Sequence, residues 1–140
     1  MPTPDALPFR THRDEVFFRE ALTATAAATG FPTPLIEKDY FCSVILQHLA
    51  SLETPLVFKG GTCLAKVHTG FNRLSEDLDF SIPVEGGTSR AQRSRLARPL
   101  KVHVDTLATD LPELVLRERL TGANNSTQYV AQLAYRSALH

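Results

Sequence analysis

Apolar residues at helical spacing predict two helices in the first third of the chain. Residues 12–29 are rich in alanine and end before Gly30, a usual helix stop. A second helix is expected with Thr33 as its N-cap and Pro34 in its first turn, and it should run to about Leu52. Its apolar residues fall on one broad face, as in a helix packed on one side.

Shorter patterns predict two strands and a third helix further along. The apolar run at 56–58 and the alternating run at 77–82 are typical of short strands, and a brief helix over 62–69 is expected between them. Residues 89–110 are predicted to be largely helical, with a kink or a break at Pro99.

The last part of the chain is predicted to be a hairpin. Residues 113–120 alternate between apolar and charged, residues 128–138 form a second strand pattern, and "TGANNST" lies between them as a turn. These elements predict an α+β fold, a small mixed sheet with N-terminal helices. The chain ends where its last strand ends, so we interpret it as the front part of a larger fold whose C-terminal helical part is absent.

The bulk properties predict a single cytoplasmic domain. A chain of 140 residues can bury a real core, here over residues 12–140, after a proline-rich flexible leader over 1–11. It contains no apolar run of about 18 residues and no signal-peptide pattern, so no membrane partner is expected. Cys42 and Cys63 lack metal-ligand spacing and are expected to be free thiols in a reducing compartment.

The glycine pair Gly60-Gly61 is a candidate phosphate-binding turn. Placed between a strand and a helix, it allows backbone N–H groups to approach a ligand at the positive end of the helix, and Thr62 adds a hydroxyl. For the pair alone, a tight turn without a ligand is the better explanation.

Two aspartates on the following strand make a ligand-binding role for the glycine turn the better explanation. Side chains alternate along a strand, so Asp77 and Asp79 share one face while Leu78 and Phe80 point to the core. Adjacent carboxylates repel each other unless a cation lies between them, and Mg²⁺ accepts one or two carboxylates together with water and phosphate oxygens. A solvent-facing acidic edge is the alternative, but with the glycine turn upstream the pattern favours metal-assisted phosphoryl or nucleotidyl transfer.

Three further side chains lie near these groups in sequence. Lys66 could reach a phosphate or pair with Asp77, Arg73 could hold a phosphate through two hydrogen bonds, and Ser75 shares the facing of the aspartates. For each of them, a solvated or salt-bridged role explains the residue equally well.

The segments "LIEKDYFCSVIL" and "FKGGTCLAKVHTGFNRLSEDLDFSI" resemble the AbiEii/AbiGii family of nucleotidyltransferase toxins, which includes MenT-like toxins. The resemblance rests on three motifs in order, and it is close over residues 35–82 and looser over 83–140. The motifs are E-K-D-Y at 37–40, F-K-G-G-T-x-L-x-K at 58–66 and R-x-S-x-D-[IL]-D at 73–79.

The resemblance implies a DNA-polymerase-β-like nucleotidyltransferase fold and a role in a toxin–antitoxin or phage abortive-infection system. The implied reaction is Mg²⁺-dependent transfer of a nucleoside monophosphate from an NTP to tRNA or another macromolecule, with a cognate antitoxin protein as a possible partner. The implied phosphate-binding residues are Gly60, Gly61, Thr62, Lys66 and Arg73; the metal ligands are Asp77 and Asp79; the catalytic residues are Asp77, Asp79, Ser75 and Lys66.

The family uses a third carboxylate on a later strand, and this chain has no acidic residue at a matching position. Asp105 and Asp110 lie on or beside a predicted helix, and Glu113 and Glu118 alternate with core residues of a strand, so none fits. The alternative function is therefore a truncated or degenerate module that binds nucleotide or a partner without turnover.

The remaining charged groups have simpler explanations. The formal net charge is zero, which argues against a general attraction to nucleic acid. Glu37 and Asp39 have a functional role only through the resemblance, and an exposed helix start, where acids are favoured near the positive dipole end, explains them at least equally well. A basic run, Arg90, Arg93, Arg95, Arg98 and Lys101, is most simply a solvated helix face, and the resemblance offers tRNA phosphates as its alternative contact.

Overall fold

The structure is a computed structural model that describes residues 10–60 and 77–140. These residues form two compact units. The helical unit contains residues 10–47, 60 and 77–78 together with Ser137–His140, and the sheet unit contains His48–Lys59 and Asp79–Arg136.

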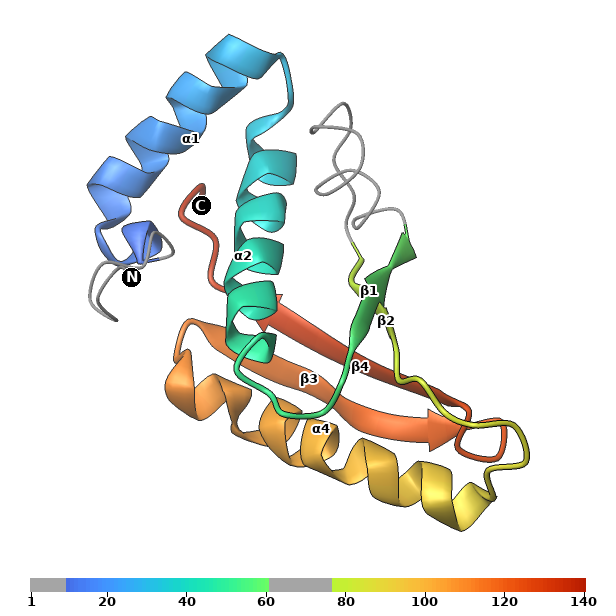
Figure 1. The fold of residues 1–140 in the computed structure, drawn as a ribbon. Helices are drawn as coiled ribbons and strands as arrows, with labels where there is room; N and C mark the ends of the chain where they lie inside the picture. The colour runs from blue at the N-terminus through green and yellow to red at the C-terminus, as the bar shows by residue number, and fades with distance from the viewer. Residues whose placement is uncertain (1–9, 61–76) are drawn as a thin grey trace. The chain divides into compact units, whose positions relative to one another are not determined.

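The helical unit begins with a short 3₁₀ turn, η2 (Thr11–Arg13), followed by α1 (Glu15–Thr29) (Figure 1). The Asp14 carboxylate accepts a hydrogen bond from the backbone N–H of Phe17 at 3.0 Å and caps the first turn of α1. Gly30 ends the helix with a left-handed φ of 78°, and its N–H donates to the Ala26 carbonyl. The predicted helix over 12–29 is thus confirmed, with its first residues in the turn and the cap.

The second helix, α2 (Thr33–Leu49), starts one residue earlier than predicted. The Pro32 carbonyl accepts hydrogen bonds from the N–H groups of Leu35 and Ile36 and so occupies the position expected of Thr33. The N-cap residue accepts these bonds through its carbonyl oxygen. Proline lacks a backbone N–H but has this carbonyl, so it can stand at the N-cap position. The helix also ends before Leu52, whose N–H closes a turn on the Leu49 carbonyl.

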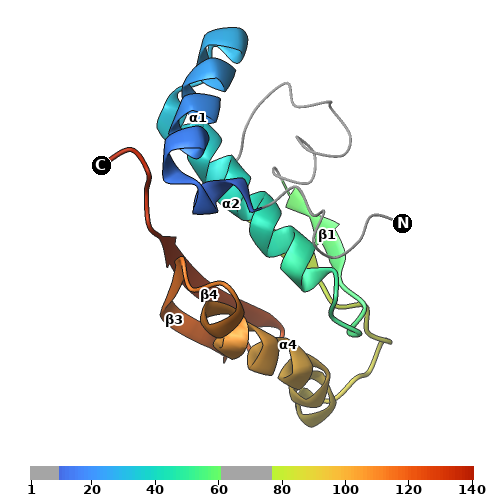
Figure 2. The same ribbon diagram turned by 90° about the vertical axis from the view of Figure 1, so that its left-hand side faces the viewer.

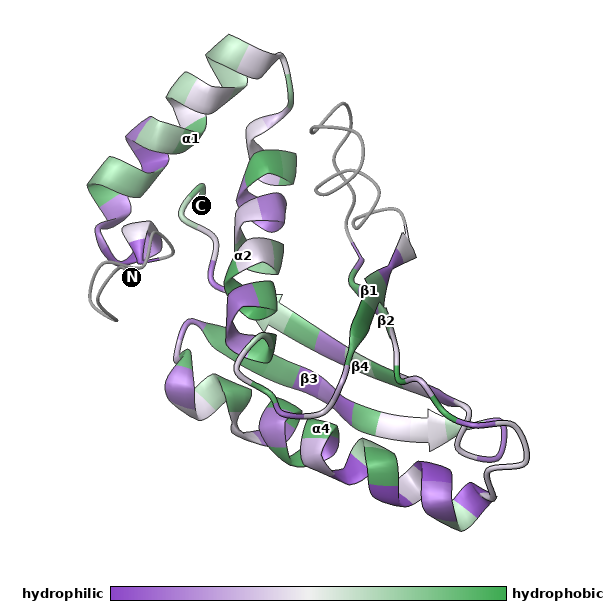
Figure 3. Ribbon diagram, in the orientation of Figure 1, coloured by the Kyte–Doolittle hydropathy of each residue, from purple (hydrophilic) through white to green (hydrophobic). Residues whose placement is uncertain are grey.

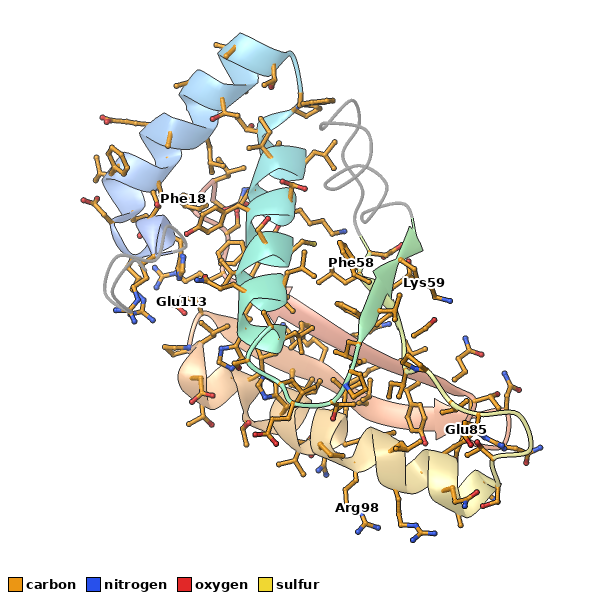
Figure 4. The ribbon with its side chains drawn as sticks, in the orientation of Figure 1. Phe18, Phe58, Lys59, Glu85, Arg98 and Glu113 are labelled. Carbon is orange, nitrogen blue, oxygen red and sulfur yellow. The ribbon has the colours of Figure 1, made fainter. Side chains whose placement is uncertain are left out.

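Aromatic rings pack α1 against α2. Phe18 and Phe41 are almost fully buried, and the ring of Phe18 lies 4.7 Å from that of Tyr40, centroid to centroid. The Tyr40 hydroxyl lies 2.8 Å from Nδ1 of His12, which joins η2 to the same cluster. Figure 4 shows Phe18 directed from α1 toward α2. Cys42, also on α2, is buried, as expected.

The sheet unit combines two antiparallel strand pairs with one long helix, which is consistent with the predicted α+β class. Strand β1 (Val57–Lys59) pairs with β2 (Asp79–Ser81), and β3 (Leu114–Ala123) pairs with β4 (Gln128–Tyr135). Helix α4 (Arg90–Asp110) follows β2 and lies along the β3–β4 hairpin in both views (Figures 1 and 2). The buried apolar side chains of the described part of this unit are Leu49 together with Ala97, Val104 and Leu107 of α4 and Leu114 of β3.

Helix α4 is continuous through Pro99, so of the predicted kink or break there, the break does not occur. Ser89 and Gln92 form a reciprocal capping box at its start, with bonds of 3.2 and 2.8 Å. The proline removes one backbone donor, but buried side chains on both sides of it hold the helix together.

The hairpin turn is shorter than predicted, because β3 continues to Ala123 and the turn covers only residues 124–127, and β4 ends at Tyr135 rather than at 138. Asn124, Asn125 and Ser126 all have positive φ, which asparagine tolerates better than most residues. Arg93 of α4 donates to the Asn125 carbonyl at 2.7 Å and also to the Thr88 carbonyl, so it ties the turn to the start of the helix. None of the helices within the described ranges is long and apolar enough to span a bilayer.

Candidate active site

The β1–β2 ladder separates an apolar face from a charged one. Phe58 is paired with Phe80, and their ring centroids lie 5.4 Å apart. Lys59 is paired with Asp79, and both residues are exposed. Figure 4 shows Phe58 and Lys59 leaving β1 on opposite sides. The predicted alternation is confirmed for Asp79 and Phe80, but β2 begins only at Asp79, so the expectation that Asp77 lies on the same strand was wrong.

Lys59 is the site residue that the sequence reasoning missed. Residues directly opposite in an antiparallel ladder have Cβ atoms about 4.5–5.5 Å apart, so the Lys59 ammonium can reach the Asp79 carboxylate or an anion beside it. The signal was present in the local pattern. Lys59 follows Phe58 as Asp79 precedes Phe80, so both charged residues fall on the face away from the phenylalanines.

Gly60 directly follows β1 and has a φ of 81°. This left-handed conformation is readily accessible to glycine and costs other residues roughly 1–2 kcal/mol. The chain therefore turns at Gly60 in a way that suits the predicted strand-to-helix turn.

The other predicted site residues are described only in part. Asp77 is exposed and belongs to the helical unit. The predicted helix over 62–69 lies outside the described residues, as do five of the predicted site residues: Gly61, Thr62, Lys66, Arg73 and Ser75.

The later acids of the sheet unit are engaged with basic side chains. Asp105 accepts two hydrogen bonds from the Arg119 guanidinium, at 3.1 and 2.5 Å, and these hold the pKa of Asp105 below its usual value. Oδ2 of Asp110, the last residue of α4, lies 3.2 Å from Nε2 of His48. Across the two described ranges, no group of three or more His, Cys, Asp or Glu side chains could hold a metal ion.

His48 and His103 form a second pair that the sequence did not indicate. Their ring centroids are 4.8 Å apart, at the end of α2 and in the middle of α4. Burial, and next the neighbouring His48, lower the pKa of His103. The sequence separation of these residues hides the pair from any local pattern.

The basic run on α4 divides into two groups. Arg93 is bonded to the carbonyls of the turns, and the Lys101 ammonium lies over the Tyr129 ring, 5.0 Å from its centroid. Arg90, Arg95 and Arg98 are exposed, as expected of a solvated face.

Glu37 of the E-K-D-Y segment is buried, so its assignment to an exposed helix start was wrong. Its side chain is only 2% exposed. The carboxylate accepts hydrogen bonds from the Ser137 hydroxyl at 2.8 Å and from the Ala138 N–H at 2.6 Å. Arg19 donates to the Ala138 carbonyl at 2.8 Å, so residue 138 is held at both of its backbone polar groups.

Comparison with known families gives a match over more than half of the chain. The family described as nucleotidyl transferase AbiEii toxin, type IV toxin–antitoxin system, matches residues 44–138. The chain belongs to the AbiEii family. The match contains the β1–β2 ladder and also α4 and the hairpin, where the motif resemblance was looser, whereas E-K-D-Y precedes it. No curated protein and no solved structure matches the AbiEii chain.

Proposed function

We propose that this AbiEii chain binds Mg–NTP at the β1–β2 ladder and transfers a nucleoside monophosphate to tRNA or another macromolecule. The observation that supports it best is the exposed Lys59–Asp79 pair directly beside a left-handed glycine. A cation, a carboxylate and a glycine turn are the groups that a triphosphate with its metal ion requires. A polymerase-β-like arrangement of the site belongs to the same proposal.

The triphosphate is assigned to the turn after β1. Backbone N–H groups of Gly60, Gly61 and Thr62 would donate to phosphate oxygens, with Lys66 and Arg73 as further cations. Lys59 adds a positive charge on the Asp79 face of the ladder. Ser75 is assigned a supporting position beside the aspartates.

Asp77 and Asp79 are the residues that would hold Mg²⁺. Two exposed carboxylates suit an ion that takes its remaining ligands from water and phosphate, and they do not amount to a closed metal cage. When bound, the ion neutralises negative charge on the phosphates. In the transfer, an acceptor hydroxyl would lose its proton to water and its oxygen would bond to the α-phosphorus. The bond from that phosphorus to the oxygen bridging to the β-phosphate would break, and pyrophosphate would leave.

A binding module without turnover is the second candidate. It is supported by the pairing of Asp105 with Arg119 and of Asp110 with His48, which leaves neither acid available as a third carboxylate. Such a module would still bind Mg–NTP through the β1–β2 ladder.

The two candidates are separated by measuring binding and transfer on the same samples. Transfer of label from an α-labelled NTP mixture to total tRNA, lost in Asp79→Asn and kept in the control Glu20→Gln, is expected of the transferase. Glu20 is an exposed acid on α1. Calorimetric binding of Mg–NTP without transfer would establish the second candidate, and the absence of both would overturn the assignment of the site.

A further inference from the structure

The outer face of α4 carries a surface that the proposed function does not use. Two adjacent depressions, of about 680 and 500 Å³, share Arg95 as a lining residue. The first lies between the loop at 83–88 and the first turns of α4, and the second follows the middle of the helix. We call the two together the α4 groove.

Apolar side chains form a stripe along the α4 groove. Leu96, Pro99 and Val102 recur every three residues and therefore lie on one side of the helix. Leu96 is 43% exposed and Val102 is 58% exposed, and Val84 adds a third exposed aliphatic side chain from the loop. Exposed apolar residues gathered in this way, unlike scattered ones, mark interaction surfaces.

The charge beside the stripe is positive. Two arginines, Arg95 and Arg98, line the groove against one acid, Glu85 of the loop, and no further acidic residue occurs before Asp105. Figure 4 shows Arg98 extending away from the helix, and Figure 3 shows hydrophilic and hydrophobic residues interleaved along α4. Arg93 and Lys101, on the same helix, are instead engaged with the hairpin.

We propose that the α4 groove binds an acidic amphipathic helix of a partner protein. Apolar side chains of that helix would cover the stripe while its carboxylates pair with Arg95 and Arg98, as in helix-in-groove recognition. The stripe runs over seven residues, from Leu96 to Val102, a rise of about 9 Å, which matches roughly two turns of a partner helix. This binding is independent of the nucleotide site and does not rest on the proposed function.

RNA suits the same surface less well. Phosphates would pair with the two arginines but would leave Leu96, Pro99 and Val102 against a charged backbone. None of the residues that line the two depressions is Phe, Tyr or Trp, and the one imidazole among them, His103, lies against the ring of His48, so the surface offers bases no open stacking platform. The combination of an apolar stripe with two cations favours a protein segment.

The test uses the full chain and a synthetic probe. The probe is a fluorescein-labelled peptide of about 18 residues, long enough to form a helix, with leucines on one face and glutamates elsewhere. A second peptide has the same composition with its leucines scattered over all faces, and single-stranded RNA of similar length is the third probe. Binding is measured by fluorescence anisotropy at physiological salt.

Variants locate the binding on the chain. Val102→Asp and Arg98→Glu are each expected to weaken binding of the amphipathic peptide by about tenfold or more, as at central interface positions. Val16→Asp and Arg117→Glu are matched controls at exposed positions on α1 and β3 and should leave binding unchanged. Circular dichroism verifies that each variant is folded.

The outcomes separate the proposal from its alternatives. Saturable binding of the amphipathic peptide that responds only to the groove variants supports it. Equal binding of the scattered-leucine peptide, tighter binding of RNA, or no binding of the amphipathic peptide would each overturn it.

Discussion

At the scale of single residues, the role of Glu37 in the E-K-D-Y motif depends on partners far away in the sequence. Its carboxylate binds the hydroxyl of Ser137 and the N–H of Ala138, about a hundred residues further along the chain. Local reasoning placed this acid at an exposed helix start, because helix position and charge were the only visible facts. The structure assigns it to a buried anchor for the segment that follows β4.

Removing this anchor should destabilise the protein. In Glu37→Ala both donors lose a charged acceptor, and the free energy of unfolding is expected to fall by about 2–3 kcal/mol. Urea denaturation followed by circular dichroism measures it. Glu37→Gln keeps one acceptor oxygen and should lose about half as much.

The matched control for this loss is Glu20→Ala. Glu20 is exposed on α1, so its truncation should change the free energy of unfolding by less than about 0.5 kcal/mol. Equal losses for Glu20→Ala and Glu37→Ala would show that the anchor contributes nothing.

At the same scale, the site could be predicted only in part. The alternation of Asp79 with Phe80 is a property of any strand and was visible in the sequence. The pairing of Lys59 with Asp79 depends on the register of two strands separated by nineteen residues, which the motif alone does not state. The side-chain partners of Arg93, Asp105 and Asp110 likewise come from elements that no local pattern connects.

At the scale of secondary-structure elements, prediction succeeded where the signals are local. Glycine ended α1, the asparagine-rich turn separated β3 from β4, and periodicity located α2 and α4. The errors also have local causes. A proline carbonyl capped α2 in place of Thr33, and side-chain packing outweighed the helix-breaking tendency of Pro99.

The contact between His48 and His103 within the sheet unit makes stability depend on pH. Burial, and next His48, lower the pKa of His103 below its ordinary value of 6.5, while Asp110 opposes the shift. In the unfolded chain the ordinary pKa returns, so below about pH 6.5 the unfolded state binds more protons than the native state. The contribution of His103 to the free energy of unfolding is therefore fully present above about pH 6.5, and it is lost as the pH falls toward the pKa that His103 has in the native state.

Urea denaturation at about pH 7.5 and 5.5, either side of the ordinary histidine pKa, measures this dependence. The loss of stability at the lower pH should be smaller in His103→Gln than in the wild type. His140→Gln, at an exposed histidine, should keep the wild-type loss. An unchanged loss in His103→Gln would remove His103 as its cause.

At the scale of the whole molecule, ligand binding should appear as a gain in stability. A zero net charge provides no general attraction for anions, so binding of Mg–NTP must come from particular groups. A ligand that binds only the folded state stabilises it by about 2.7 kcal/mol at a hundred times its dissociation constant. The wild type should therefore show a rise in melting temperature with NTP and Mg²⁺.

Lys59→Gln tests whether this gain comes from the β1–β2 ladder. Lys59 is exposed, so the substitution should change intrinsic stability by less than about 0.5 kcal/mol. It removes the cation opposite Asp79, so the rise in melting temperature with Mg–NTP should shrink or disappear. Arg117→Gln, at an exposed cation of β3, is the matched control and should keep the full rise. The melting temperatures of the three proteins are measured with and without Mg²⁺ and each of ATP, CTP, GTP and UTP. If the rise in melting temperature is as large in Lys59→Gln as in the wild type, nucleotide binds away from this ladder.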